Sequence, residues 1–213
     1  MSKQRLSIIF SALMVVAVLM ACDATSVVQP IPPAPATPTP CDVTCPPPLG
    51  SPAGSKAVQA THFTFWYYDP PWTLTDHNAN RAILTHETDF GTITVALLSS
   101  QVASGASADD LLAAWVKQNL DPNKYQGLRE RGSIHGAEIG YVAGAGTTYT
   151  ANLALPNAPA APVFLQVLAA THGTTGLVLV VLSPLDPSHP DPTDRSQVRS
   201  VAYDHIVNSV RWL

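Results

Sequence analysis

Seven histidines, the residues best suited to proton transfer and transition-metal binding, are scattered along the sequence. No two of them stand two or four residues apart, the spacings that place two imidazoles on one face of a strand or helix. His189 has acidic neighbours, since Asp186, Asp191 and Asp194 lie in the same segment. Together these side chains could hold a cation. The prolines between them point neighbouring side chains apart, however, so a solvated loop is favoured.

The sequence patterns of the common hydrolases and nucleotide-binding enzymes do not occur. His86 and Glu87 lack the second histidine of a zinc-protease helix. The Gly-Ala-Gly segment at 144–146 lacks the third glycine of a dinucleotide fingerprint, and we expect it to form a flexible hairpin between strands. A carboxylate beside His135 or His172 in a pocket would indicate a hydrolase of unusual composition. Otherwise the sequence predicts neither catalysis nor a cofactor.

The first of three cysteines, Cys22, follows a secretory leader. Lys3 and Arg5 precede an apolar run over 6–20, and a small residue stands just before the cysteine. This order is typical of a cleaved signal peptide, and the run is too short for a membrane span. The tetrapeptide Leu-Met-Ala-Cys at 19–22 resembles a bacterial lipobox. That resemblance implies lipidation of Cys22 as the mature N-terminus; secretion with an incidental cysteine is the alternative.

Cys41 and Cys45 remain as a pair separated by three residues. An exported chain enters an oxidising compartment, so a small local disulfide is the favoured interpretation. A metal site would need further ligands, and no histidine is near in sequence. A redox-active dithiol is also disfavoured, because the spacing differs from Cys-x-x-Cys. Free thiols are the remaining alternative.

Composition divides the chain into a leader (1–21), a proline-rich tether (22–55) and a globular domain (56–213). Prolines fix φ and remove hydrogen-bond donors, so the tether favours extended polyproline II and cannot form a core. It could hold the domain away from a membrane or, less favoured, act as a ligand for a partner. The 158 residues that follow have the size of one domain.

Charge excludes one class of partner. Loss of the leader with its two basic residues changes the formal net charge from −4 to −6. Nucleic-acid binding needs clustered Lys and Arg, and no such cluster occurs. No polybasic patch for anionic lipids occurs either, so the lipid on Cys22 would provide membrane attachment. We therefore expect a protein on the extracytoplasmic face of the cell membrane.

The sequence of the domain predicts an α+β fold with several strands and two helices. Ser107 is suited to N-cap a helix, because acidic residues fill the first turn and apolar residues recur at helical spacing up to Leu120. A second helix is expected near the end of the chain, with His205 on its apolar stripe and a capping box at Asp194 and Gln197. Strands are expected at 61–68, 81–88, 92–98, 139–143, 147–155, 163–171 and 177–182.

An aromatic cluster stands at the first of these strands. Alternation places Phe63, Phe65 and Tyr67 on one face of the strand and Trp66 with Tyr68 on the other. One face must pack in the core. Trp66, Tyr68 and the following Trp72 are then candidates for an exposed interface, because exposed aromatics commonly anchor protein contacts. The alternative is that helices cover both faces.

The order of elements resembles the PsbP-like fold. The resemblance is carried by Tyr-Asp-Pro-Pro-Trp at 68–72, Gly-Ala-Glu-Ile-Gly-Tyr at 136–141 and Asp-His-Ile-Val-Asn-Ser-Val-Arg-Trp at 204–212. It implies an antiparallel sheet flanked by helices, an α/β/α sandwich found in photosystem accessory proteins, nuclear import adaptors and LpqN-type bacterial lipoproteins. It also implies a binding or assembly role without catalysis.

These observations together predict a lipid-anchored envelope module that contacts a partner protein. A metal- or small-ligand-binding lipoprotein is one alternative, with His189 and its aspartates as ligands in the metal case. An envelope hydrolase is the other.

Overall fold

The computed structural model describes residues 52–89, 91–185 and 200–213, with the side chains of 200–202 left aside. The leader, the tether up to residue 51 and the acidic segment around His189 lie outside the described residues. So do Cys22, Cys41, Cys45 and the capping box predicted at Asp194. The predictions made for these residues remain predictions.

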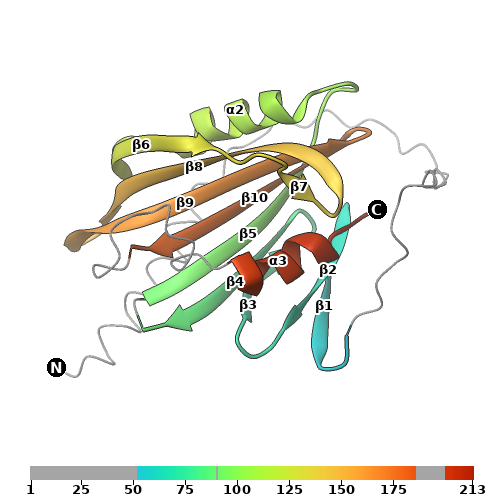
Figure 1. Cartoon of the computed structure of the whole chain (residues 1–213), viewed down its shortest axis with the longest axis horizontal. Coiled ribbons are helices and arrows are strands. Elements are labelled where there is room, and N and C mark those ends of the chain that lie inside the picture. Colours follow the sequence, from blue (N-terminus) through green and yellow to red (C-terminus); the bar gives the residue numbers. More distant parts are fainter. Residues whose placement is uncertain (1–51, 90, 186–199) are drawn as a thin grey trace.

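Two antiparallel sheets and two helices build the domain (Figure 1). The elements are β1 (Ser55–Gln59), β2 (Phe63–Tyr68), β3 (Thr73–Asn78), β4 (Arg81–Thr88), β5 (Gly91–Gln101), α2 (Ala108–Asn119), β6 (Tyr125–Ser133), β7 (Glu138–Ile139), β8 (Val142–Leu155), β9 (Ala158–His172), β10 (Thr175–Pro184), α3 (Ser200–Ser209) and β11 (Arg211–Trp212).

The large sheet has the strand order β3-β4-β5-β10-β9-β8-β6, and β7 pairs with β8 beside this path. β10 lies at the centre, between β5 and β9, and residues 177–182 are all buried. This confirms the prediction that the apolar run at 177–182 is a central strand covered on both faces. The predicted hairpin of 81–88 and 92–98 is also confirmed, since β4 and β5 pair with Thr88 opposite Gly91.

Alternation along the central strands separates two cores. Leu179 and Val181 point into one core, which lies between the sheet, α3 and the small sheet β1-β2-β11. Val178 and Val180 point into the other, which lies under α2. The antiparallel α+β architecture with a helix on each face confirms the predicted fold class (Figure 1). The small sheet, which shares a layer with α3, was not predicted.

Helix α2 begins where the sequence predicted. The Ser107 hydroxyl accepts a hydrogen bond from the Asp110 amide at 3.0 Å, and the Leu120 amide donates to the Val116 carbonyl at the other end. None of the twelve helical residues is fully buried, although four apolar side chains pack partly against the sheet. The helix therefore covers its core loosely. No helix among the described residues is long and apolar enough to cross a membrane.

Two local predictions were wrong. The Gly-Ala-Gly segment at 144–146 is not a hairpin but the interior of β8, where Gly144 pairs with Ala170 of β9. A Cβ at Gly144 would lie 2.1 Å from the Ala169 carbonyl oxygen, so glycine here permits a close strand approach. The strand predicted at 139–143 is instead two strands, β7 and β8, joined by a tight turn at Gly140 and Tyr141.

Candidate functional site

The two faces of β2 divide as predicted. Phe63, Phe65 and Tyr67 belong to the main core, with Phe63 and Phe65 stacked at 6.1 Å between ring centroids. Trp66 and Tyr68 lie on the opposite face and contact each other edge to face at 5.4 Å. The alternation therefore determines which aromatic side chains can reach the surface.

Trp66, Tyr68 and Trp72 do not form one exposed surface. Trp66 is 8% exposed, Tyr68 is half-buried, and Trp72 is only 2% exposed. Trp72 packs in the main core with its ring 5.3 Å from that of His86, edge to face. Trp72 therefore serves the core, because the chain after Tyr68 folds the indole inward rather than toward solvent.

His205 covers the other two aromatics. Its ring lies 5.8 Å from Trp66 and 5.7 Å from Tyr68, measured between centroids, and its side chain is exposed. Trp66 Nε1 is buried and has no hydrogen-bond partner in the part of the chain that the structure describes. This arrangement is a packed aromatic cluster at the margin of α3, with little free aromatic area.

A different aromatic residue, Tyr141, is prominently exposed. Tyr141 is 42% exposed and has φ 65°, in the left-handed region that costs a bulky side chain about 1–2 kcal/mol. It occupies the second position of the two-residue turn between β7 and β8, where Ile139 pairs with Val142. Gly140 takes the first position with φ 59°. Positive φ at both positions is the requirement of a type I′ hairpin.

Contacts with the end of α3 fix this turn. The Gly140 amide donates to the Val207 carbonyl at 3.0 Å, and a Cβ at Gly140 would lie 2.4 Å from the Val210 carbonyl oxygen. Only glycine fits at that position. Tertiary packing on Gly140 therefore holds the strained backbone of Tyr141, whose ring is exposed at the tip of the turn.

Two further rings lie next to the turn. The Trp212 indole N–H donates to the Ile139 carbonyl at 3.0 Å, and the His172 ring lies 5.7 Å from the Trp212 ring. Leu213, next to Trp212, is 60% exposed. Figure 1 shows this end of the chain beside the β7–β8 turn. We call the group Tyr141, His172 and Trp212 the Tyr141 patch. Sequence reasoning missed it because its parts are far apart in the chain.

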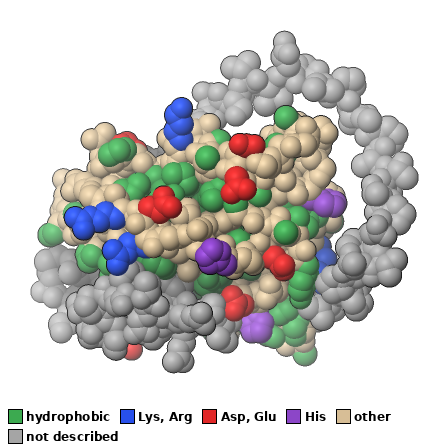
Figure 2. All heavy atoms as spheres, turned by 45° about the horizontal axis from the view of Figure 1, so that its top comes forward, with side chains coloured by type: hydrophobic (Ala, Val, Ile, Leu, Met, Phe, Trp, Pro, Cys, Tyr) green, Lys and Arg blue, Asp and Glu red, His purple; other side chains and the backbone are tan. Residues whose placement is uncertain are grey.

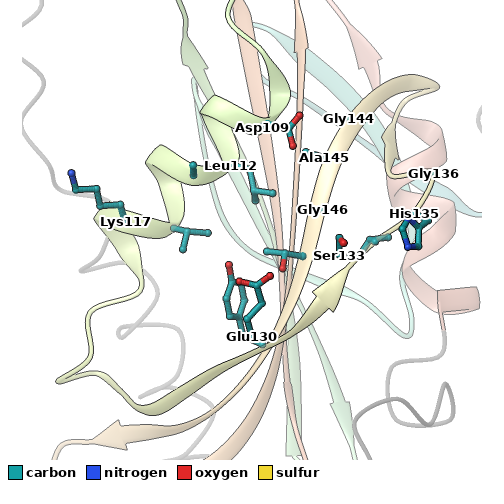
Figure 3. Close-up of a pocket in the computed structure, with 15 residues that line it drawn as sticks. Asp109, Leu112, Lys117, Glu130, Ser133, His135, Gly136, Gly144, Ala145 and Gly146 are labelled. Atoms are coloured by element: carbon teal, nitrogen blue, oxygen red, sulfur yellow. The ribbon is translucent and has the colours of Figure 1, made fainter.

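The hydrolase alternative required a carboxylate beside His135 or His172 in a pocket. A pocket of about 700 Å³ opens between α2, β6 and β8, and Glu130, Ser133 and His135 are among its lining residues (Figure 3). A hydrolase would need the nucleophile and its base in hydrogen-bond reach. Among the described residues, no hydrogen bond joins these three side chains. The described ranges also contain no group of three or more His, Cys, Asp or Glu that could hold a metal.

No protein-family model matches the sequence, and neither does any curated protein. Solved structures do match. The Ran-binding protein Mog1p of Saccharomyces cerevisiae superposes with a TM-score of 0.51 at 9% identity, over 74% of this chain and 94% of that one. LpqN of Mycobacterium tuberculosis, described as involved in cell envelope biogenesis, gives 0.42 at 11% identity, over 74% and 84%.

The cyanobacterial PsbP of Synechocystis sp. PCC 6803 gives a TM-score of 0.39 at 15% identity, over 78% of this chain and 100% of that one. At these identities the comparisons concern the fold alone. The superposition on Mog1p shows that the domain of this chain has a Mog1-like fold, an α+β architecture of the kind that the sequence resemblance implied.

Proposed function

We propose that this protein is a lipid-anchored module of the bacterial cell envelope that binds a partner protein through the Tyr141 patch and catalyses no reaction. The observation that carries the proposal is the exposed ring of Tyr141 on a turn whose backbone the end of α3 holds in place. Tyrosine and tryptophan are the residue types that most often dominate the binding energy of protein interfaces. A tyrosine on a fixed backbone has only two side-chain torsions to lose on binding.

The strain at Tyr141 favours this interpretation. An asparagine or glycine would suit its backbone conformation better, and Tyr141 is not one of the buried residues of the core. Strained positions that persist are often functional, since the rest of the fold must stabilise them. The Ran-binding name of the yeast protein with this fold is consistent with a protein-binding role, although the fold does not specify a surface.

The lipid anchor rests on Cys22 and its leader. Metabolic labelling with an alkyne fatty acid in the source bacterium should label the full chain. Cys22→Ala should abolish the label and release the protein from membranes, whereas Cys41→Ala should retain both. Labelling that survives Cys22→Ala would contradict the anchor and leave the binding surface to be tested separately.

Site-specific photocrosslinking tests the binding surface. A benzoylphenylalanine at position 172, within the patch, should crosslink the full chain to one defined envelope protein. The same probe at position 118, on the exposed side of α2, should not. Tyr141→Asn should remove the crosslink from position 172 without lowering the melting temperature. Equal crosslinking from both positions, or a crosslink indifferent to Tyr141→Asn, would contradict the proposal.

A further inference from the structure

The space under α2 is an opening in an otherwise dense core. Amphipathic helices normally bury their apolar stripe, but Leu112 and Val116 stay half-buried because a pocket of about 700 Å³ lies beneath them. The opposite wall comes from β8, where Ala145 contributes only a methyl group. This volume falls within the range of about 300–1,000 Å³ that is usual for small-molecule sites.

Glu130 gives the pocket its principal polar group. It stands opposite Tyr149 across β6 and β8, and Figure 3 shows its side chain directed from β6 toward the space under α2. Among the described residues Glu130 makes no ion pair. Burial, together with the negative charge of Glu130, raises the pKa of Tyr149. Glu130 is itself solvent-exposed, so its carboxylate stands at the mouth of the pocket rather than in its interior.

A second carboxylate lines the same pocket at the start of α2. Asp109 lies in the first helical turn, and it also makes no ion pair among the described residues. Lys117 is the basic side chain of the lining, but in Figure 3 it extends outward from the far end of α2. Figure 2 shows the same face, where acidic side chains alternate with hydrophobic surface. An apolar wall with two exposed carboxylates at its rim, neither in an ion pair among the described residues, complements a cation that carries an apolar body.

We propose that the pocket between α2, β6 and β8 binds a small organic amine, whose ammonium group pairs with Glu130 while its apolar part lies against Leu112, Val116 and Ala145. The neutral hydroxyls of Ser133 and Thr147 lie on the same lining and can accept the remaining N–H groups. A carboxylate ligand would be repelled, and an alcohol of the same shape would lack the charge-assisted bond. This site is separate from the Tyr141 patch and does not depend on it.

Three ligands of one shape test the charge preference. The full mature chain, labelled with ¹⁵N, would be titrated with 4-phenylbutylamine, 4-phenylbutanol and 4-phenylbutyrate. We expect the amine to shift the amide signals of Val116, Ala145 and Gly146 with a Kd in the millimolar range or tighter. The alcohol should bind roughly tenfold more weakly, in keeping with the loss of one charge-assisted bond. The carboxylate should not bind.

Matched variants locate the site. Glu130→Gln should weaken amine binding about tenfold and equalise the amine and the alcohol, whereas Glu138→Gln, an exposed glutamate outside the pocket, should change nothing. Ala145→Leu should fill the pocket and abolish binding of both ligands. Thermal unfolding of each variant shows whether a loss of binding comes from the altered pocket or from an unfolded protein. A variant that is less stable but binds the amine unchanged would contradict the proposed site.

Several results would overturn the proposal. Equal affinity for amine and alcohol in the unaltered protein would show that Glu130 does not recognise the ammonium group. Amine binding that survives both Glu130→Gln and Ala145→Leu would place the site elsewhere. Signal shifts with a lysine-containing peptide but with no free amine would assign the pocket to a side chain of a partner protein.

Discussion

The Ser209 hydroxyl lies within hydrogen-bond distance of both backbone polar groups of Trp66, a residue 143 positions earlier in the chain. The Trp66 amide donates to Ser209 Oγ at 3.0 Å, while the single hydroxyl hydrogen of Ser209 is shared between the carbonyls of Ile206 at 2.9 Å and Trp66 at 3.1 Å. β11 pairs with β2 only at Thr64 and Phe63, so the strand edge beyond that point would have no backbone partner there. One side chain at the end of α3 thus continues the pairing of the small sheet and joins helix to strand.

Replacement of Ser209 should therefore lower the stability of the domain more than its small side chain would suggest. Ser209→Ala leaves the buried Trp66 amide without an acceptor, and we expect the free energy of unfolding to fall by about 1–3 kcal/mol. Chemical denaturation followed by tryptophan fluorescence measures this change. Ser104→Ala, at an exposed loop position, should stay within about 0.5 kcal/mol of the unaltered protein. A result in which the two variants are equal would remove the proposed role of the hydroxyl.

Alkaline pH should destabilise the domain through Tyr203. This tyrosine on α3 is 9% exposed, and its hydroxyl donates to Gln166 Oε1 of β9 at 2.5 Å. Burial, and to a lesser degree the charge of Asp204, raises its pKa to about 12 from the ordinary 10.0. Below pH 10 the phenol is protonated in both states, and the stabilisation is fully present. Between pH 10 and 12 only the unfolded chain ionises, so the stabilisation is lost, to about 3 kcal/mol in all.

Tyr203→Phe isolates that contribution. The variant should be about 1 kcal/mol less stable at neutral pH, because the bond to Gln166 is lost, but its stability should fall less steeply above pH 10. Urea denaturation of both proteins from pH 8 to pH 11.5 measures the difference in slope. Tyr141→Phe, at an exposed ring, controls for the loss of one tyrosine. Parallel slopes for Tyr203→Phe and the unaltered protein would refute the assignment.

Sequence periodicity predicted the elements that lie in the middle of the molecule. The strands β4, β5 and β10 and the helix α2 have regular apolar patterns because each faces a core on at least one side. The two edge strands of the large sheet, β3 and β6, were not predicted. Both are mostly exposed and rich in polar residues, as sheet edges are, so neither has a clear apolar alternation.

The candidate site escaped sequence reasoning for a different reason. Gly140 and Tyr141 form their turn because the end of α3 packs on it, and nothing in the local sequence records that contact. The aromatic run at 63–68 attracted attention because its residues are adjacent, yet adjacency in a strand divides side chains between two faces. Whether Trp72 and Tyr141 lie in the core or at the surface depends on the packing of distant segments, which the local sequence does not reveal.

For glycines whose φ is not positive, the stability cost of replacement by alanine should depend on the atoms that the added methyl group would contact. At Gly144 a Cβ would lie 2.1 Å from a backbone oxygen of β9, whereas at Gly146 the closest atom is the Ile134 Cβ at 3.1 Å. Backbone cannot yield as a side chain can, so Gly144→Ala should cost more than Gly146→Ala, with overpacking costs of about 1–3 kcal/mol as the scale. Thermal unfolding of the two variants measures the order, and the reverse order would mean that β8 shifts freely against β9.

Relief of strain at Tyr141 gives the sharpest separation of stability from function. Asparagine tolerates the left-handed region better than tyrosine, so Tyr141→Asn should leave the isolated protein as stable as before or more stable by up to about 1 kcal/mol. Replacement of a tyrosine that merely supports the fold would instead be destabilising. Calorimetric melting of Tyr141→Asn beside Tyr141→Phe, which keeps the strain, measures the effect. A stabilised Tyr141→Asn protein that has lost its crosslinked partner would show that the strained ring serves binding, whereas a destabilised one would mean that the ring serves the fold.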